Sequence, residues 1–274
     1  RGLPAGAAPE TFVLSRPDLI EEVARLYVEA GADLIPTNTF GGTPARLADC
    51  GLGDRVAEVN RLAVEAVRRA VGTAALVSGS MGPTGRMLRP YGDADPAEVA
   101  EGFFEQARAL AGAGVDLFCV ETMIALEEAR LAVSAARRAA PGVPIVATMT
   151  FERSRRGFFT VMGDSVASVA RGLAEAGADL VGSNCGNGIA TMVEIARAFR
   201  EVTPLPLVIQ SNAGLPELVD GRLTYAETPR MFAEAVPALV AAGVRLVGGC
   251  CGTTPAHVRA VRDALRGGGT DWRQ

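Results

Sequence analysis

The sequence contains no lysine, one histidine and one tryptophan, and aromatic residues make up only 5% of its 274 positions. All 27 basic residues are therefore arginine, and 31 acidic residues outnumber them, which leaves a net charge of −4. No run rich in basic residues is present. Because nucleic-acid binding relies on such runs to neutralise phosphates, we do not expect a nucleic-acid partner.

Long apolar runs are also missing. No stretch approaches the roughly 18–20 apolar residues that a membrane span requires, and the first residues do not resemble a signal peptide, so we expect no membrane association. The 5 cysteines are too few, and odd in number, for a disulfide scaffold, which predicts a reduced, cytoplasmic protein. With 49% hydrophobic residues and a mean hydropathy of +0.22, the chain has ample material for a large core.

One short pattern recurs along the chain and predicts alternating helices and strands. An Ala-Gly pair followed by two residues and a leucine occurs at 30–34, 113–117, 176–180 and 242–246. Each copy ends a stretch of helical periodicity and opens an apolar run, which indicates a helix ending on a left-handed glycine before a buried strand. Three more apolar runs of similar length lie at 74–78, 144–148 and 206–209.

Helical segments are expected between these strands, with Ser15 and Asp95 as N-terminal caps of the first two. They cover residues 17–30, 96–112, 126–140, 165–177, 192–202, 228–243 and 255–266. The strands follow one another about every 35 residues, the length of a strand, a crossover helix and two loops.

This rhythm predicts an α/β fold, a (β/α)8 TIM barrel in a single domain spanning residues 1–274. Only seven strands are found, and the chain opens on loop-like residues 1–10 followed by a helix, so the first strand is either missing or upstream of residue 1. The segment 11–14 is apolar enough for a short strand but lies too close to the helix. An open doubly wound sheet, which needs no eighth strand, is the alternative.

Three cysteines are expected to converge. Cys185 ends one strand, and Cys250 and Cys251 end another that is separated from it by a single neighbour. Three thiolates suit Zn2+ and leave a fourth position for water or substrate. Adjacent cysteines reach one ion only if the backbone turns, which the glycines at 248, 249 and 252 permit. Spacing alone also allows buried structural cysteines, a vicinal disulfide or an anion-binding turn. Cys50 and Cys119 are interpreted as ordinary thiols.

Several motifs resemble the homocysteine S-methyltransferase family. Asn184-Cys185-Gly186 and the run Gly248-Gly249-Cys250-Cys251-Gly252-Thr253-Thr254-Pro255 look like its zinc motifs, and the likeness extends from about residue 9 to residue 266. Similar segments are Gly31-Ala32-Asp33 through Thr37-Asn38-Thr39-Phe40-Gly41, Gly82-Pro83-Thr84-Gly85, Glu121-Thr122 and Asn212-Ala213-Gly214-Leu215-Pro216-Glu217. Within the family, Gly82-Pro83-Thr84-Gly85 most resembles the homocysteine-binding module of cobalamin-dependent methionine synthases.

The resemblance implies a zinc barrel that methylates homocysteine to methionine. Cys185, Cys250 and Cys251 would bind one Zn2+ per chain, and the zinc-bound substrate thiolate would be the nucleophile, with no other catalytic residue. Coordination matters because a free thiol is only about 3% thiolate at pH 7. The implied methyl donor is methylcobalamin or another methylcorrinoid carried by a partner domain or subunit.

Four residues are expected to contact substrate. The resemblance assigns Glu121 to the substrate ammonium, although bonding to loop amides is the alternative. Asn38, Asn184 and Asn212 each follow a strand and would either bind substrate or orient the zinc ligands. His257 is expected at the surface or in helix packing, since a zinc-ionised thiol needs no general base.

Three other functions stay open at this point. One is a stand-alone enzyme that takes methyl from S-methylmethionine or betaine, and another is a zinc- or thiol-binding domain without turnover. The third is binding of a phosphate ligand at the glycine turn 248–252. One departure from the family is also present: its first strand carries an Asp-Gly motif that helps to bind the amino acid, and no such motif stands before Leu34.

Overall fold

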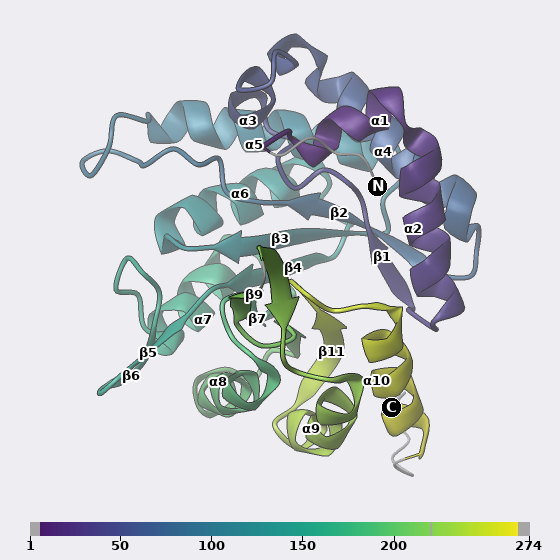
Figure 1. The fold of residues 1–274 in the computed structure, drawn as a ribbon. Helices are drawn as coiled ribbons and strands as arrows, with labels where there is room; N and C mark the ends of the chain where they lie inside the picture. The colour runs from purple at the N-terminus through teal and green to yellow at the C-terminus, as the bar shows by residue number, and fades with distance from the viewer. Residues whose placement is uncertain (1–5, 220, 268–274) are drawn as a thin grey trace.

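The computed structural model describes residues 6–219 and 221–267, and their main feature is one curled parallel sheet (Figure 1). Its strand order is β1-β2-β3-β4-β7-β8-β11. The strands are β1 (Leu34–Pro36), β2 (Leu76–Met81), β3 (Leu117–Met123), β4 (Ile145–Met149), β7 (Leu180–Asn184), β8 (Leu207–Ser211) and β11 (Val244–Gly249). The order follows the chain without reversal, which confirms the barrel-like fold and excludes the doubly wound sheet.

Long helices surround this sheet and pack on one another in chain order, with α10 also contacting α2. They are α2 (Pro17–Glu29), α4 (Val56–Val71), α5 (Pro96–Gly112), α6 (Leu126–Ala139), α7 (Val166–Ala176), α8 (Ile189–Val202), α9 (Pro229–Ala241) and α10 (Pro255–Gly267). Within the described ranges, none is long and apolar enough to cross a membrane. The helix α4 and the short α3 (Pro44–Ala48) had not been predicted.

The ring of helices closes, but the ring of strands does not. Among the described residues, β1 pairs only with β2 and β11 only with β8, so both strands have one unpaired edge. The helix α2 has no strand of its own before it, whereas each later long helix follows one. The sheet is therefore a half-barrel of seven strands, and the place for an eighth lies between β1 and β11.

The segment before α2 is helical, which agrees with one expectation and corrects another. Residues 11–14, judged too close to the helix to form a strand, belong to the 3-10 turn η1 (Pro9–Thr11) and to α1 (Phe12–Ser15), where the Val13 side chain is buried. Ser15 does not cap α2: its hydroxyl donates to the Thr11 carbonyl, and Arg16 occupies the cap position. Expectations for residues 1–5 lie outside the described residues.

Other helix ends match the prediction. Glycines 31, 114, 177 and 243 have φ values of +98°, +87°, +105° and +84°, the left-handed conformation expected where each helix gives way to a strand. Asp95 caps α5 by accepting a hydrogen bond from the Ala97 amide at 2.8 Å. These turns set the direction of each strand and therefore where its carboxyl end lies.

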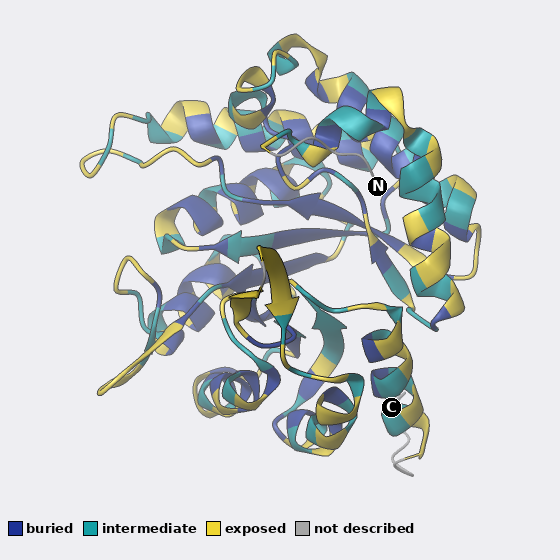
Figure 2. Ribbon diagram, viewed as in Figure 1, coloured by how far each residue is buried: buried dark blue, intermediate teal, exposed yellow. Residues whose placement is uncertain are grey.

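The strands bury both faces, as their continuous apolar runs predict. Phe118 and Val120 belong to the large core under the helices, whereas Leu117 and Cys119 belong to a small cluster inside the half-barrel. Figure 2 shows the buried sheet and the more exposed outer sides of the helices. The apolar side chains of this small cluster lie below the polar residues at the carboxyl ends of the strands.

Two hairpins extend from loops at these carboxyl ends, and neither had been predicted. One pairs β5 (Glu152–Ser154) with β6 (Gly157–Phe159), and the other pairs β9 (Pro216–Val219) with β10 (Arg222–Tyr225). Both are antiparallel and largely exposed (Figure 2). Exposed hairpins lack the buried apolar run by which the other strands were recognised.

Candidate functional site

Three sulfur atoms meet at the carboxyl ends of β7 and β11. The Sγ atoms of Cys185, Cys250 and Cys251 all lie within 4.8 Å of one another, as the order of strands predicted. Cys185 Sγ and Cys251 Sγ are 3.8 Å apart. That separation matches the edge of a tetrahedron with Zn–S bonds of about 2.3 Å, which is about 3.8 Å. The donor set and its spacing therefore fit a metal ion such as Zn2+.

A tight turn brings the two adjacent cysteines to the same side. The Cys250 amide donates to the Ser211 carbonyl at 2.7 Å, and the Cys251 amide donates to Asn212 Oδ1 at 3.1 Å. Gly252 then adopts a φ of +79°, and a Cβ there would overlap the ring of Tyr225. The turn predicted from the flanking glycines is present, and Gly252 is the position where glycine is required.

Cys185 itself has an unusual backbone. Its φ is +61°, a left-handed conformation that costs a non-glycine residue about 1–2 kcal/mol. Gly186 follows with a φ of +72°, and the Asn187 amide donates back to the Cys185 carbonyl at 2.9 Å. The resulting turn brings the Cys185 sulfur close to the sulfurs of Cys250 and Cys251. Strain of this kind persists where the surroundings over-determine the conformation.

Asn184 is the residue that braces this loop. It is fully buried, and its Oδ1 accepts from the Thr122 amide at 2.7 Å and from the Thr148 hydroxyl at 2.8 Å. Its Nδ2 donates to Thr122 Oγ1 at 2.7 Å. Thr122 has a φ of +60°, so one asparagine holds a second strained residue beside the cysteine. The strained pair had no signal in the sequence, because neither residue is glycine.

The pKa values of the three thiols are shifted in different directions. Hydrogen bonds from Cys250 and Cys251 lower the pKa of the Cys185 thiol, since they stabilise its thiolate. The hydrogen bond to Cys185, followed by burial and repulsion from its thiolate, raises the pKa of the Cys250 thiol. The hydrogen bond to Cys185 also raises the pKa of the Cys251 thiol, so Cys185 is the thiol that ionises first.

Glu121 faces the interior from the end of β3. Its Oε1 accepts a hydrogen bond from Ser80 Oγ at 2.6 Å, and burial raises the pKa of its carboxyl group. Repulsion from Cys185 adds to that rise, which places the two groups within electrostatic reach. Within the part of the chain that the structure describes, the carboxylate bonds to a side chain rather than to the loop amides considered in the sequence.

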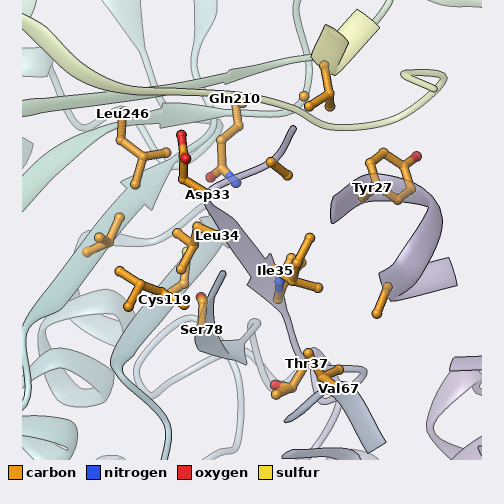
Figure 3. A pocket seen from close by; sticks show the side chains of 18 of the residues that line it. Tyr27, Asp33, Leu34, Ile35, Thr37, Val67, Ser78, Cys119, Gln210 and Leu246 are labelled. Carbon is orange, nitrogen blue, oxygen red and sulfur yellow. The ribbon is translucent and has the colours of Figure 1, made fainter. Parts of the chain in front are cut away.

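A cavity of about 1350 Å3 lies beside these groups. Residues of β1, β11, α2 and α10 line it, and its lining also includes Glu121, Cys119, Asn38 and, of the three clustered cysteines, Cys250. Figure 3 shows Cys119, Ser78 and Gln210 from different strands around it. Gln210 had not been predicted; its Oε1 is buried without a partner in the described structure, which leaves an acceptor at this wall.

The remaining expected residues fall into two groups. Asn212 is buried and holds the Cys251 amide, whereas Asn38 is half-buried and donates to the Pro9 carbonyl at 2.7 Å. Cys50 is half-buried and away from the sulfur cluster, in keeping with an ordinary thiol. His257 is 6% exposed and stacks edge-on against Phe232, so it is a packing residue and not a surface one.

Replacing Asn184 by alanine should destabilise the fold by about 1–3 kcal/mol, because the Thr122 amide would lose its buried acceptor. Ser183→Ala is the matched control on the same strand: Ser183 Oγ is buried without a partner in the described structure, so its removal should be neutral or stabilising. Urea unfolding of both variants measures the difference. Equal stability of the two variants would contradict the bracing role of Asn184.

Comparison with known proteins agrees with this site. The family model for homocysteine S-methyltransferase matches residues 6–265. Methionine synthases from Mycobacterium tuberculosis and Mycobacterium leprae are 34% and 33% identical over 262 residues, or 92% of this chain. The chain spans only about a fifth of their length, 22% and 21%.

The metallated form of the homocysteine methyltransferase MmuM from Escherichia coli has a similar fold. It superposes with a TM-score of 0.79 at 26% identity, covering 96% of this chain and 91% of that one. A methyltransferase from Methanosarcina mazei, at 14% identity and a TM-score of 0.62, shares the fold alone. The chain belongs to the homocysteine S-methyltransferase family.

Proposed function

We propose that the chain is one zinc-dependent domain that transfers a methyl group to the thiol of homocysteine and forms methionine. The observation that carries the proposal is the triangle of Cys185, Cys250 and Cys251 sulfurs, with its 3.8 Å tetrahedral edge. Zn2+ bound there would ionise the substrate thiol and hold its sulfur in place.

The protein groups would bind the amino acid around that sulfur. Glu121 lines the same cavity as Cys250, so its carboxylate can pair with the substrate ammonium while the thiol reaches the cysteines. Asn184 and Asn212 would keep the two cysteine loops in register through their hydrogen bonds, and Asn38 would contact substrate from β1. The substrate sulfur then attacks the methyl carbon, the new S–C bond forms, and the bonding pair of the broken bond leaves with the donor.

For the methyl donor we propose a methylcorrinoid such as methylcobalamin, presented by another domain or subunit. Support comes from the relatives named methionine synthase, of which this chain covers only about a fifth, so those proteins have room for a separate domain that presents the methyl donor. S-methylmethionine and betaine are the competing donors, and a binding domain without turnover is the competing function.

The first experiment measures metal content and proton release. The unchanged chain should bind about one Zn2+ and release a proton when homocysteine is added, because only the thiolate binds zinc. Cys185→Ser, Cys250→Ser and Cys251→Ser should each lose the metal, whereas Cys50→Ser and Cys119→Ser should retain it. A metal-free chain under reducing conditions with zinc supplied would overturn the proposal.

Replacing Glu121 by glutamine should raise KM for homocysteine about tenfold or more, since a charge-assisted hydrogen bond is worth about 1.5–3 kcal/mol. The raised pKa of Glu121 also predicts the direction of the pH dependence. As the pH falls through that pKa, the carboxylate is neutralised and substrate affinity drops. This acidic limb of the pH profile of KM should be missing in the variant. Glu127→Gln, on the exposed side of α6, is the control. Equal KM values would assign Glu121 a structural role.

The donor is tested by supplying one methyl source at a time to the zinc-loaded chain. Methionine should form with methylcobalamin and not with S-methylmethionine or betaine alone. Turnover with either small donor in the absence of cobalamin would replace the proposed donor, and homocysteine binding with no turnover from any donor would favour the binding domain.

A further inference from the structure

Two loops from different parts of the chain carry the sulfur atoms, and Glu227 is hydrogen-bonded toward both of them. This residue lies between β10 and α9 and is half-buried. It had no place in the sequence analysis, because a single glutamate between a turn and a helix has no distinguishing pattern. Its three polar groups each contact a different segment.

The carboxylate of Glu227 reaches the Cys185 loop. Its Oε2 accepts from the Ile189 amide at 2.7 Å, at the start of α8, only four residues after Cys185. The cap residue of α8 is Gly188, which has no side chain to satisfy the first amides. A carboxylate at a helix N-terminus is favoured by the free N–H groups and by the helix dipole. Glu227 therefore caps, from 38 residues away, the helix that follows Cys185.

The backbone of Glu227 reaches the Cys250–Cys251 loop from two sides. Its amide donates to the Ala213 carbonyl at 2.9 Å, and the Ala213 amide donates to the Cys251 carbonyl at the same distance. Its carbonyl lies 3.1 Å from His257 Nε2. One residue is thus hydrogen-bonded toward both cysteine loops.

His257 provides the second link because its tautomer is fixed. The Thr254 amide donates to Nδ1 at 3.1 Å, so Nδ1 carries no proton, and Nε2 carries the proton that it donates to Glu227. Thr254 directly precedes α10, and Thr253 Oγ1 donates to the Cys250 carbonyl at 2.7 Å. The buried imidazole therefore joins Glu227 to the end of the cysteine turn.

We propose that Glu227, backed by His257, is a positioning residue that sets the distance between the Cys185 loop and the Cys250–Cys251 loop and thereby tunes metal affinity. The inference rests on the proposed zinc site. Residues behind metal ligands commonly change metal affinity about 10–100-fold when removed. A residue with only a structural role would change stability without changing affinity.

Two variants remove the contact in different ways. Glu227→Ala deletes the carboxylate, and Gly188→Ala retains it but displaces it, since a Cβ at residue 188 would overlap Glu227 Oε1. The φ of Gly188 is −78°, which alanine adopts without strain, so this variant keeps the fold. Glu227→Gln keeps an acceptor oxygen and serves as the conservative rescue.

A matched control lies at the opposite end of the barrel. Asp179 Oδ2 accepts from the Ile145 amide at 2.8 Å and pairs with Arg137, far from the carboxyl ends of the strands. Asp179→Ala removes a carboxylate–amide contact of the same kind. It should lower stability to a similar extent and leave the metal site unchanged.

The measurement is zinc affinity by competition with a chromophoric chelator, together with the visible spectrum of the Co2+-substituted protein. Glu227→Ala and Gly188→Ala should weaken zinc binding about tenfold or more and alter the Co2+ bands, and Glu227→Gln should recover most of the affinity. Parent-like affinity and spectra in both variants would overturn the inference alone. An unchanged chain that binds no zinc would overturn the proposed function as well.

Discussion

The structure depends on holding three sulfur atoms within 4.8 Å of one another, although Cys185 and Cys251 are 66 residues apart. Such groups repel one another once ionised, so the fold must impose their proximity before a cation compensates for it. The parallel sheet provides the first part of the solution, because the carboxyl ends of β7 and β11 lie one strand apart. Local turns provide the second, through the left-handed Cys185 and the Gly252 turn.

Hydrogen bonds around the sulfurs extend beyond the three cysteines to several polar side chains. Asn184 braces the loop after β7, Asn212 holds the turn after β11, and Glu227 links the two from outside. Each of these side chains satisfies main-chain groups that an irregular loop would otherwise leave unpaired. Hydrogen bonds from side chains therefore fix the main chain of these loops.

The sequence was sufficient to predict the seven strands, most of the helices and the meeting of the cysteines. Those features follow from apolar run length, from the Ala-Gly pairs and from the order of strands. It was insufficient for Cys185 and Thr122, whose left-handed backbones do not follow from residue type; that of Thr122 is held by hydrogen bonds to Asn184. It also failed for Ser15, whose hydroxyl bonds within the preceding helical segment, and for the two hairpins, which are exposed and lack a buried apolar run. Gln210 and Glu227 are recognised only once the strands they neighbour are placed in space.

Among the described residues, β1 and β11 each have one unpaired edge, so the sheet has two free ends, which we call arms. The contacts made by the two arms differ. All three sulfurs belong to one arm, β7-β8-β11, where hydrogen-bonded neighbours keep their spacing constant. Asn38 belongs to the other end of the sheet, and residues of both ends line the cavity. The Tyr27 hydroxyl of α2, which lines this cavity, donates to the Thr253 carbonyl at 3.1 Å, directly beside the turn of Cys250 and Cys251. A displacement of α2 that widens the cavity would therefore also pull on the turn that carries two of the three sulfurs.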